Sequence, residues 1–389
     1  MMEKKKTEVV IVGAGLAGLA TAACLTMHAI PHVILEREDC IASLWHKKSY
    51  DRLHLHLAKQ FCQLPHLPHP SSCPTFMSKN HFITYINDYV ACFNLCPRLR
   101  CEVESAFFDD EDGKWQVVVR NLETGEVEEY VARFVVVATG ENDKAVVPEF
   151  PGIESFPGEV IHSMDYRNGS KYKGKDVLVV GCGNSGMEIA LDLSNFGAKA
   201  TIVVRNELHV VPRELLFWIM LLRKFLPIYL LDALLLFLCY FKYGDTAKYG
   251  IQRPKQGPLH LKETTPIYPV IDVGTFQKIK SGHIQVLPSV KSIKGNNVRF
   301  KNEISHQFDA IILATGYKSS AKEWLKGDDY LIGEDGISKQ KFPNHWKGRH
   351  GLYCAGLVRK GIYGLANDAE KIANDINTLL KDDDAKKMN

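Results

Sequence analysis

Apolar and small residues near the amino-terminal end of the chain are arranged as a strand, a helix and a second strand. Residues 7–12 are β-branched and mostly apolar, as in a buried strand. A glycine-rich turn follows, then the alanine-rich stretch 19–28, which predicts a helix, and the apolar run 32–35, which predicts another strand. This order predicts a βαβ unit, in which the two strands run parallel.

The same succession returns in the second half of the chain. Residues 176–180 predict a strand, residues 187–196 a helix and residues 200–204 a second strand, again with a glycine-rich turn after the first strand. Between the two units, a helical pattern at 82–93 precedes four segments with strand patterning. These segments are residues 102–108, 115–120, 126–131 and 134–137.

The elements predicted after the second unit complete an α/β architecture. Residues 310–313 and 351–354 predict buried strands, and residues 364–380 predict a helix, with a frayed polar tail after residue 381. The repeated βαβ pattern predicts two Rossmann-like dinucleotide-binding domains, the second inserted into the first. The predicted boundaries are 1–150 and 301–389 for the first domain and 151–300 for the second, which includes an apolar helical insert at 214–250.

Composition narrows the function classes. Of the 389 residues, 46% are hydrophobic and 24% charged, as in a globular protein. The formal net charge of +3 gives no general attraction to nucleic acid, so we expect no nucleic-acid partner. The ten cysteines contain no Cys-x-x-Cys pair, and the histidines and cysteines lack metal-ligand spacing. We therefore expect no metal site, no redox dithiol and a reducing, cytoplasmic environment.

One long apolar segment, residues 215–241, needs a separate interpretation. Charged residues and Pro227 divide it into pieces too short to span a bilayer. The favoured interpretation is a buried helical pair that lines an access path for an aromatic substrate. The alternative is a peripheral contact with the surface of the endoplasmic reticulum. The amino terminus lacks the pattern of a secretory leader.

Each glycine-rich turn carries a GxGxxG pattern in the strand–turn–helix context that dinucleotide binding requires. The first glycine allows the tight turn, the second lets backbone amides approach a pyrophosphate, and the third lets helix and strand pack closely. The helix amino terminus then attracts the anion. The predicted contacts of the first site are Gly13, Ala14, Gly15, Leu16, Ala17 and Gly18, and those of the second are Gly181, Cys182, Gly183, Asn184, Ser185 and Gly186.

The residue at the end of the second strand of each unit indicates which nucleotide each site binds. Glu36 can accept hydrogen bonds from both ribose hydroxyls and would repel a 2′-phosphate, so the first site suits FAD or NAD. Arg205 stands at the equivalent place in the second unit and offers a charge-matched fork to the 2′-phosphate of NADPH. Two dinucleotides in one chain indicate electron transfer from a nicotinamide to a flavin. With no thiol relay, we expect reduced flavin to pass its electrons to O2.

Several motifs resemble those of a known family. Residues 156–166 match the FxGxxxHxxxY signature of class B flavin monooxygenases, just before the second GxGxxG. Over nearly its whole length the chain resembles the plant YUCCA-type flavin monooxygenases. The resemblance rests on residues 43–47, 50–53, 55–65, 138–142, 181–188 and 210–214. It implies conversion of indole-3-pyruvate to indole-3-acetate, the auxin hormone, with FAD, NADPH and O2 through a flavin C4a-peroxide and oxidative decarboxylation.

The resemblance also implies roles for single residues. His56 and Asn184 would act at the catalytic site, and His162 and Tyr166 would order the interdomain linker against NADPH. Further FAD contacts would come from Trp45, Ala138, Thr139, Gly140, Gly364 and Leu365. Apart from the aromatic 2-oxo acid and O2, no obligate partner is implied.

The chain departs from the family wording at Ala58, at Asp143-Lys144 and in residues 354–364, which bears on substrate preference more than on cofactor use. One alternative is therefore a flavin monooxygenase that oxidises sulfur or nitrogen centres of small molecules. A second alternative, from a different class, is a catalytically silent dinucleotide-binding protein. The two intact glycine loops and the 156–166 signature weigh against it.

Overall fold

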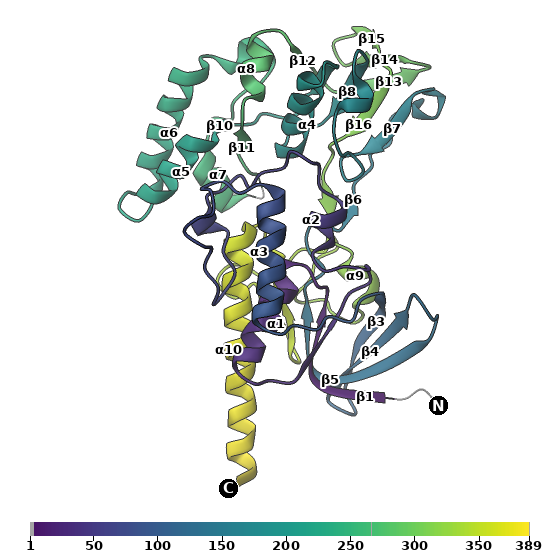
Figure 1. Ribbon diagram of the computed structural model, residues 1–389, viewed down its shortest axis with the longest axis vertical. Coiled ribbons are helices and arrows are strands. Elements are labelled where there is room, and N and C mark those ends of the chain that lie inside the picture. Colours follow the sequence, from purple (N-terminus) through teal and green to yellow (C-terminus); the bar gives the residue numbers. More distant parts are fainter. Residues whose placement is uncertain (1–3, 266, 389) are drawn as a thin grey trace. The chain divides into compact units, whose positions relative to one another are not determined.

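The computed structural model describes residues 4–265 and 267–388 and divides the chain into two compact units (Figure 1). Unit 1 comprises Met1–Lys48, Ala58–Lys144 and Tyr317–Asn389, and unit 2 comprises Ser49–Leu57 and Ala145–Gly316. The chain therefore leaves unit 1 twice and returns to it twice. Two short strands, β6 (Lys144–Ala145) and β17 (Tyr317–Lys318), stand at the later pair of boundaries.

Unit 1 is built on a six-stranded mixed sheet. The strands follow the order β2-β1-β5-β4-β3, and β18 also pairs with β5. Strand β5 runs parallel to β1 along its length, while its other edge pairs antiparallel with β4 first and parallel with β18 afterwards. The strands are β1 (Lys4–Val12), β2 (His32–Leu35), β3 (Cys101–Asp109), β4 (Lys114–Asn121), β5 (Val127–Val137) and β18 (Leu352–Cys354).

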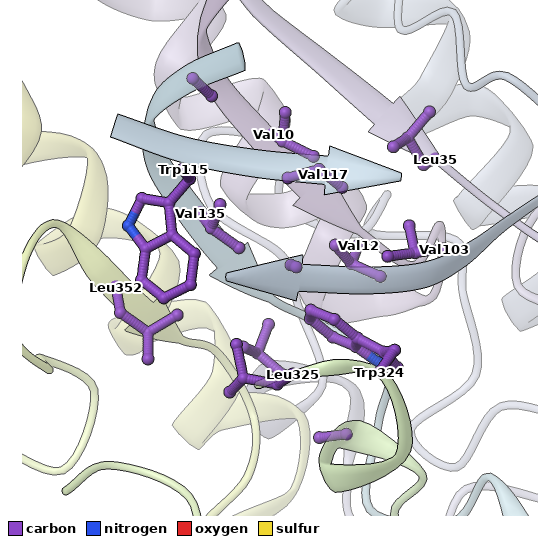
Figure 2. Packing of buried hydrophobic residues seen from close by; sticks show 14 of the residues in the cluster. Val10, Val12, Leu35, Val103, Trp115, Val117, Val135, Trp324, Leu325 and Leu352 are labelled. Carbon is purple, nitrogen blue, oxygen red and sulfur yellow. The ribbon is translucent and has the colours of Figure 1, made fainter. Parts of the chain in front are cut away.

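Apolar side chains from these strands form the core of unit 1. Figure 2 shows valines of β1, β4 and β5 grouped with Trp115, Trp324 and Leu325. The indole N–H of Trp115 donates to the carbonyl oxygen of His350 at 2.7 Å, so this buried ring has no unsatisfied polar atom. The helices of unit 1 are α1 (Leu16–Met27), α2 (Ser43–Lys47), α3 (Lys79–Cys92), α9 (Ala321–Trp324) and α10 (Gly361–Met388), with a 3-10 turn at Lys59–Phe61.

Unit 2 is built on a five-stranded, fully parallel sheet in the order β12-β9-β8-β16-β7. Its strands are β7 (Glu159–His162), β8 (Asp176–Val180), β9 (Lys199–Val203), β12 (Ile284–Leu287) and β16 (Ala310–Leu313). A small antiparallel sheet and one parallel pair accompany it. They consist of β13 (Val290–Lys294), β14 (Asn297–Phe300), β15 (Ser305–Gln307), β10 (Val210–Pro212) and β11 (Val270–Asp272).

The helices of unit 2 are α4 (Asn184–Asn195), α5 (Arg213–Leu222), α6 (Ile228–Tyr243), α7 (Pro258–Thr264) and α8 (Thr275–Lys280), with 3-10 turns at Ile153–Ser155, Ser170–Tyr172 and Thr246–Tyr249. The apolar segment 215–241 forms a helical pair, as predicted, but the prediction that it is buried is wrong for one of its faces. Leu216, Leu231 and Leu235 are buried, whereas Phe225 is 80% exposed and Phe241 85% exposed. Within the described ranges, no helix is long and apolar enough to cross a membrane.

Three further predictions differ from the structure. Strand β16 completes the sheet of unit 2, so this unit ends at Gly316 rather than at residue 300. Residues 126–131 and 134–137 belong to one strand, β5. Helix α10 begins at Gly361, one turn earlier than expected, and runs to Met388 without a frayed tail at residue 381. An ion pair between Arg133 and Asp383, together with the helix-forming alanine and lysines near the end, supports these last turns.

Candidate cofactor sites

The first glycine loop joins β1 to α1 in unit 1. Gly13 has φ +112°, and a side chain there would lie 2.5 Å from the carbonyl oxygen of Ala138. A side chain at Gly18 would lie 1.9 Å from the carbonyl oxygen of Gly13, which explains why α1 can pack this close to the turn. A Cβ at Gly15 meets no protein atom within 4 Å. The backbone of Gly15 is therefore open to a ligand. At Gly13 and Gly18, glycine is required because a side chain would clash with neighbouring backbone atoms.

The carboxylate of Glu36 is held against this loop. It accepts hydrogen bonds from the N–H of Ala14 at 2.7 Å and from the N–H of Glu38 at 2.9 Å. Glu36 is 8% exposed, and burial raises the pKa of its carboxyl group, while the two backbone donors act in the opposite direction. The strand end thus presents a fixed acceptor beside the amino terminus of α1.

A cavity of about 530 Å³ opens in front of the loop, within the range of ordinary ligand pockets. The predicted residues among its walls are Gly13, Gly15, Leu16, Ala17, Glu36, Trp45, Ala138, Thr139, Gly140 and Leu365. Ala14, Gly18 and Gly364 stand outside this lining, although the N–H of Ala14 bonds the Glu36 carboxylate. Trp45 stacks edge-on against Phe82, with ring centroids 4.6 Å apart. Most of the predicted contacts therefore surround one cavity.

Sequence reasoning missed a group of polar residues in the cavity wall. Arg37 forms an ion pair with Asp143, whose other carboxylate oxygen accepts from Ser320. Glu141 places one carboxylate oxygen at a buried position without a hydrogen-bond partner, and burial raises the pKa of its carboxyl group. Such an acceptor fits a hydrogen-bond donor of a bound molecule. The sequence motif Ala138-Thr139-Gly140-Glu141 was the signal that could have identified Glu141 as part of this site.

The second glycine loop, in unit 2, repeats this geometry. Gly181 has φ +119°, and a side chain there would lie 2.3 Å from the carbonyl oxygen of Ala314. A side chain at Gly186 would lie 2.0 Å from the carbonyl oxygen of Gly181, whereas one at Gly183 meets no protein atom within 4 Å. The second loop therefore also leaves its middle glycine open at the start of a helix, here α4.

The other predicted residues around this loop have distinct environments. The side-chain oxygen of Asn184 accepts from the N–H of Ile271 at 2.8 Å and so ties α4 to β11. Arg205 follows β9 and is exposed. Burial raises the pKa of the Cys182 thiol to about 12, so this cysteine stays protonated at neutral pH. Ser185 is partly exposed.

The two residues predicted from the 156–166 signature belong to the interior of unit 2. Tyr166 is 1% exposed, and its hydroxyl donates to Asp192 on α4 at 2.7 Å. This position does not support a direct contact between Tyr166 and a nucleotide, because the ring is buried and the hydroxyl is engaged. His162 ends β7 and accepts from the N–H of Met164 at 3.3 Å. Burial lowers the pKa of His162, so the ring is neutral at pH 7.

His56 lies in the short segment that unit 2 takes from the amino-terminal part of the chain. Its Nε2 atom contacts a carboxylate oxygen of Glu188, one turn beyond Asn184 on α4. Arg52 approaches the second oxygen of Glu188 at 4.0 Å. The structure therefore brings His56 and Asn184 to the same end of α4, and Glu188 is the functional candidate that sequence reasoning missed.

Comparisons with known proteins agree with this geometry. Residues 4–363 match the family described as FMO-like, flavin-binding monooxygenase-like. The chain is 52% identical to the probable indole-3-pyruvate monooxygenase YUCCA10 of Arabidopsis thaliana, covering 96% of this chain and 98% of the relative. It is 50% identical to indole-3-pyruvate monooxygenase YUCCA6 of the same plant, covering 96% of this chain and 91% of the relative. It is 47% identical to indole-3-pyruvate monooxygenase YUCCA1 of Oryza sativa subsp. japonica, covering 100% and 96%.

Solved structures share the fold at low sequence identity. A flavin-containing monooxygenase from Stenotrophomonas maltophilia matches with a TM-score of 0.72 at 20% identity, covering 97% of this chain and 99% of that one. An open form of cyclohexanone monooxygenase matches with a TM-score of 0.69 at 18% identity, covering 97% and 88%. The α/β architecture with two Rossmann-like domains is thus the one found in flavin monooxygenases.

Proposed function

This chain belongs to the flavin-binding monooxygenase-like family, and on that premise we propose that it is an indole-3-pyruvate monooxygenase using FAD, NADPH and O2. The observation that carries the proposal is identity of 47–52% to proteins of that name across at least 95% of this chain in each of the three relatives compared. The reaction converts indole-3-pyruvate, O2, NADPH and a proton into indole-3-acetate, CO2, NADP⁺ and water.

We assign FAD to the cavity of unit 1. The amides at the start of α1 would face its pyrophosphate across Gly15, and Glu36 would accept from its ribose hydroxyls. The unpartnered oxygen of Glu141 supports the assignment, because FAD has hydrogen-bond donors that could bond to this oxygen. When bound, the flavin supplies the chemistry of hydride acceptance and oxygen activation.

We assign NADPH to the loop of unit 2, with Gly183 at its pyrophosphate and Arg205 at its 2′-phosphate. Arg205 is exposed and lies two residues beyond the end of β9, one residue farther from its strand than Glu36 is from β2, and its charge distinguishes the two sites. Asn184 and Glu188 order the first turns of α4, where the nucleotide would lie. Tyr166 contributes through Asp192 on the same helix.

Replacing Arg205 by alanine tests the assignment of NADPH. We expect the ratio of kcat/KM for NADPH to that for NADH to fall by about 10- to 100-fold, because a charge-assisted fork to the 2′-phosphate is lost. Steady-state kinetics with both nucleotides measure this ratio. Arg205→Lys keeps the charge without the fork and should give an intermediate value. An unchanged ratio in Arg205→Ala would remove Arg205 from the site.

We propose that His56 keeps the reaction coupled, held in orientation by Glu188. In His56→Ala we expect a larger share of the NADPH consumed to appear as hydrogen peroxide, because water gains access to the reacting oxygen. Glu188→Gln keeps a hydrogen-bond partner for the ring and should show a smaller rise. The measurement is hydrogen peroxide and indole-3-acetate formed per NADPH. If both ratios match those of the wild type, His56 has no part in coupling.

The substrate assigned here is a small aromatic 2-oxo acid, and we propose that the enzyme works in the cytoplasm without an obligate protein partner. The small aromatic ring and the carboxylate would have to be held near the flavin. The preference between indole and phenyl side chains can be measured by comparing the amount of product formed per NADPH with an indole-bearing and with a phenyl-bearing 2-oxo acid.

A further inference from the structure

The outer surface of the helical pair α5–α6 carries large apolar side chains that contact no neighbouring element closely enough to bury them. We call this surface the outer face. Its members, each at least 36% exposed, are Trp218, Leu221, Leu222, Phe225, Leu226, Tyr229, Leu230, Leu234, Phe237, Tyr240 and Phe241. Scattered single apolar residues are ordinary on a protein surface, but a continuous group of this size marks an interaction site.

Helix α6 is apolar on two sides that do different work. Leu231, Leu235 and Cys239 recur at helical spacing and are buried in a cluster shared with α5 and α7. Leu230, Leu234, Phe237 and Phe241 follow the same spacing on the outer face and are exposed. Helices α5, α6 and α7 lie together in Figure 1. The inner side of α6 therefore packs in the hydrophobic core of unit 2, whereas the outer face does not contribute to that core.

The net exposed charge of the pair is positive, although the exposed Glu214 pairs with Arg213 in the first turn of α5. Asp232 is the only acidic residue in 215–243, and it is buried, where its two oxygens accept from the N–H groups of Leu259 at 2.8 Å and His260 at 3.0 Å. The cations Arg223, Lys224 and Lys242 are exposed at the two ends of the outer face. Arg213 pairs with Glu214, and Arg223 pairs with Glu263 on α7, so the two lysines account for the net positive charge.

We propose that the outer face rests in the headgroup region of an anionic lipid bilayer, with α5 and α6 lying in the plane of the membrane. Phenylalanine and leucine would enter the acyl boundary, and Trp218, Tyr229 and Tyr240 have the amphipathic rings that favour the interface. Lysines at both ends complement anionic headgroups. A contact with a second copy of the chain is the competing occupant, and the measurements below distinguish it. This inference does not depend on the reaction proposed above.

Flotation of the full-length holoenzyme with vesicles tests the inference. We expect binding to phosphatidylcholine vesicles containing phosphatidylserine, and at least about a tenfold loss of binding in the triple variant Phe225→Ser, Phe237→Ser, Phe241→Ser. These side chains are 65–85% exposed, so the variant should fold normally. A matched triple variant at exposed positions elsewhere, Met27→Ser, Leu122→Ser and Val147→Ser, should bind like the wild type.

Two further measurements separate a lipid surface from other occupants. Lys224→Gln with Lys242→Gln should weaken binding to the anionic vesicles more than binding to pure phosphatidylcholine. Vesicles should also shift the Trp218 fluorescence to shorter wavelength, an effect that Trp218→Phe removes while vesicle binding remains. Absence of vesicle binding would overturn the inference. So would a wild-type dimer in solution that the triple phenylalanine variant converts to monomer.

Discussion

Gly15→Val is expected to give a folded but colourless protein. A side chain at position 15 meets no protein atom within 4 Å, and φ there is −74°, which any residue adopts. The same side chain projects where the amides at the start of α1 would approach the FAD pyrophosphate. We therefore expect flavin occupancy to fall to about a tenth of the wild-type value or less, because the valine side chain keeps the pyrophosphate away from these amides.

Flavin absorbance per protein measures the flavin occupancy, and the thermal unfolding curve shows whether the variant is folded. Gly18→Ala is the contrasting variant. Its Cβ would lie 1.9 Å from the Gly13 carbonyl oxygen, so it should lose stability as well as flavin. A Gly15→Val protein that purifies with one FAD per chain would show that the cofactor does not use this loop.

Gly183→Val is expected to give a yellow protein that NADPH hardly reduces. Position 183 has φ −85° and open space around its Cβ, so the fold of unit 2 should tolerate the change. The side chain would occupy the approach to the nucleotide pyrophosphate. We expect anaerobic flavin reduction by NADPH to slow by about 100-fold or more, with FAD content unchanged.

Stopped-flow absorbance under anaerobic conditions measures this rate. Dithionite should still reduce the flavin of Gly183→Val, which establishes that the flavin itself is competent. Wild-type rates of reduction by saturating and by limiting NADPH would contradict the assignment of NADPH to unit 2. Together the two valine variants ask whether the two loops serve two different dinucleotides.

Elements with strong local signals could be predicted from the sequence. The strands His32–Leu35, Asp176–Val180 and Ala310–Leu313 have the predicted bounds. Each is a short, mainly apolar run, and a glutamate, a glycine or the small residue Ala314 follows it. The two tight turns could also be predicted from their glycines. Gly13 and Gly181 have φ above +100°, a conformation that few residues other than glycine adopt.

Pairings between distant segments could not be predicted in this way. Ser49–Leu57 belongs to unit 2, and His56 meets Glu188 across a separation of 132 residues. Nothing local to either residue encodes that contact, because it depends on how parallel strands and crossovers assemble. Strand β16 likewise joins the sheet of unit 2 through its partners β7 and β8.

The apolar helical pair shows a different limit. Composition identifies an apolar stretch but does not tell whether both sides of a helix find partners. In the structure, the inner side of α6 does and the outer face does not. The buried Asp232 also affects the exposed charge of the pair. Because Glu214 is then the one exposed acidic residue described in α5 and α6, and it pairs with Arg213, the net exposed charge is basic.

The reaction proposed for this chain is the insertion of oxygen from O2 into indole-3-pyruvate, with NADPH as the reductant. The most direct measurement is turnover under ¹⁸O2 with catalase present, followed by mass spectrometry of the product. We expect one indole-3-acetate per NADPH, carrying one atom of ¹⁸O in its carboxylate. Catalase removes any contribution from free hydrogen peroxide. NADPH consumption that leaves indole-3-pyruvate intact and releases only hydrogen peroxide would contradict the proposed reaction.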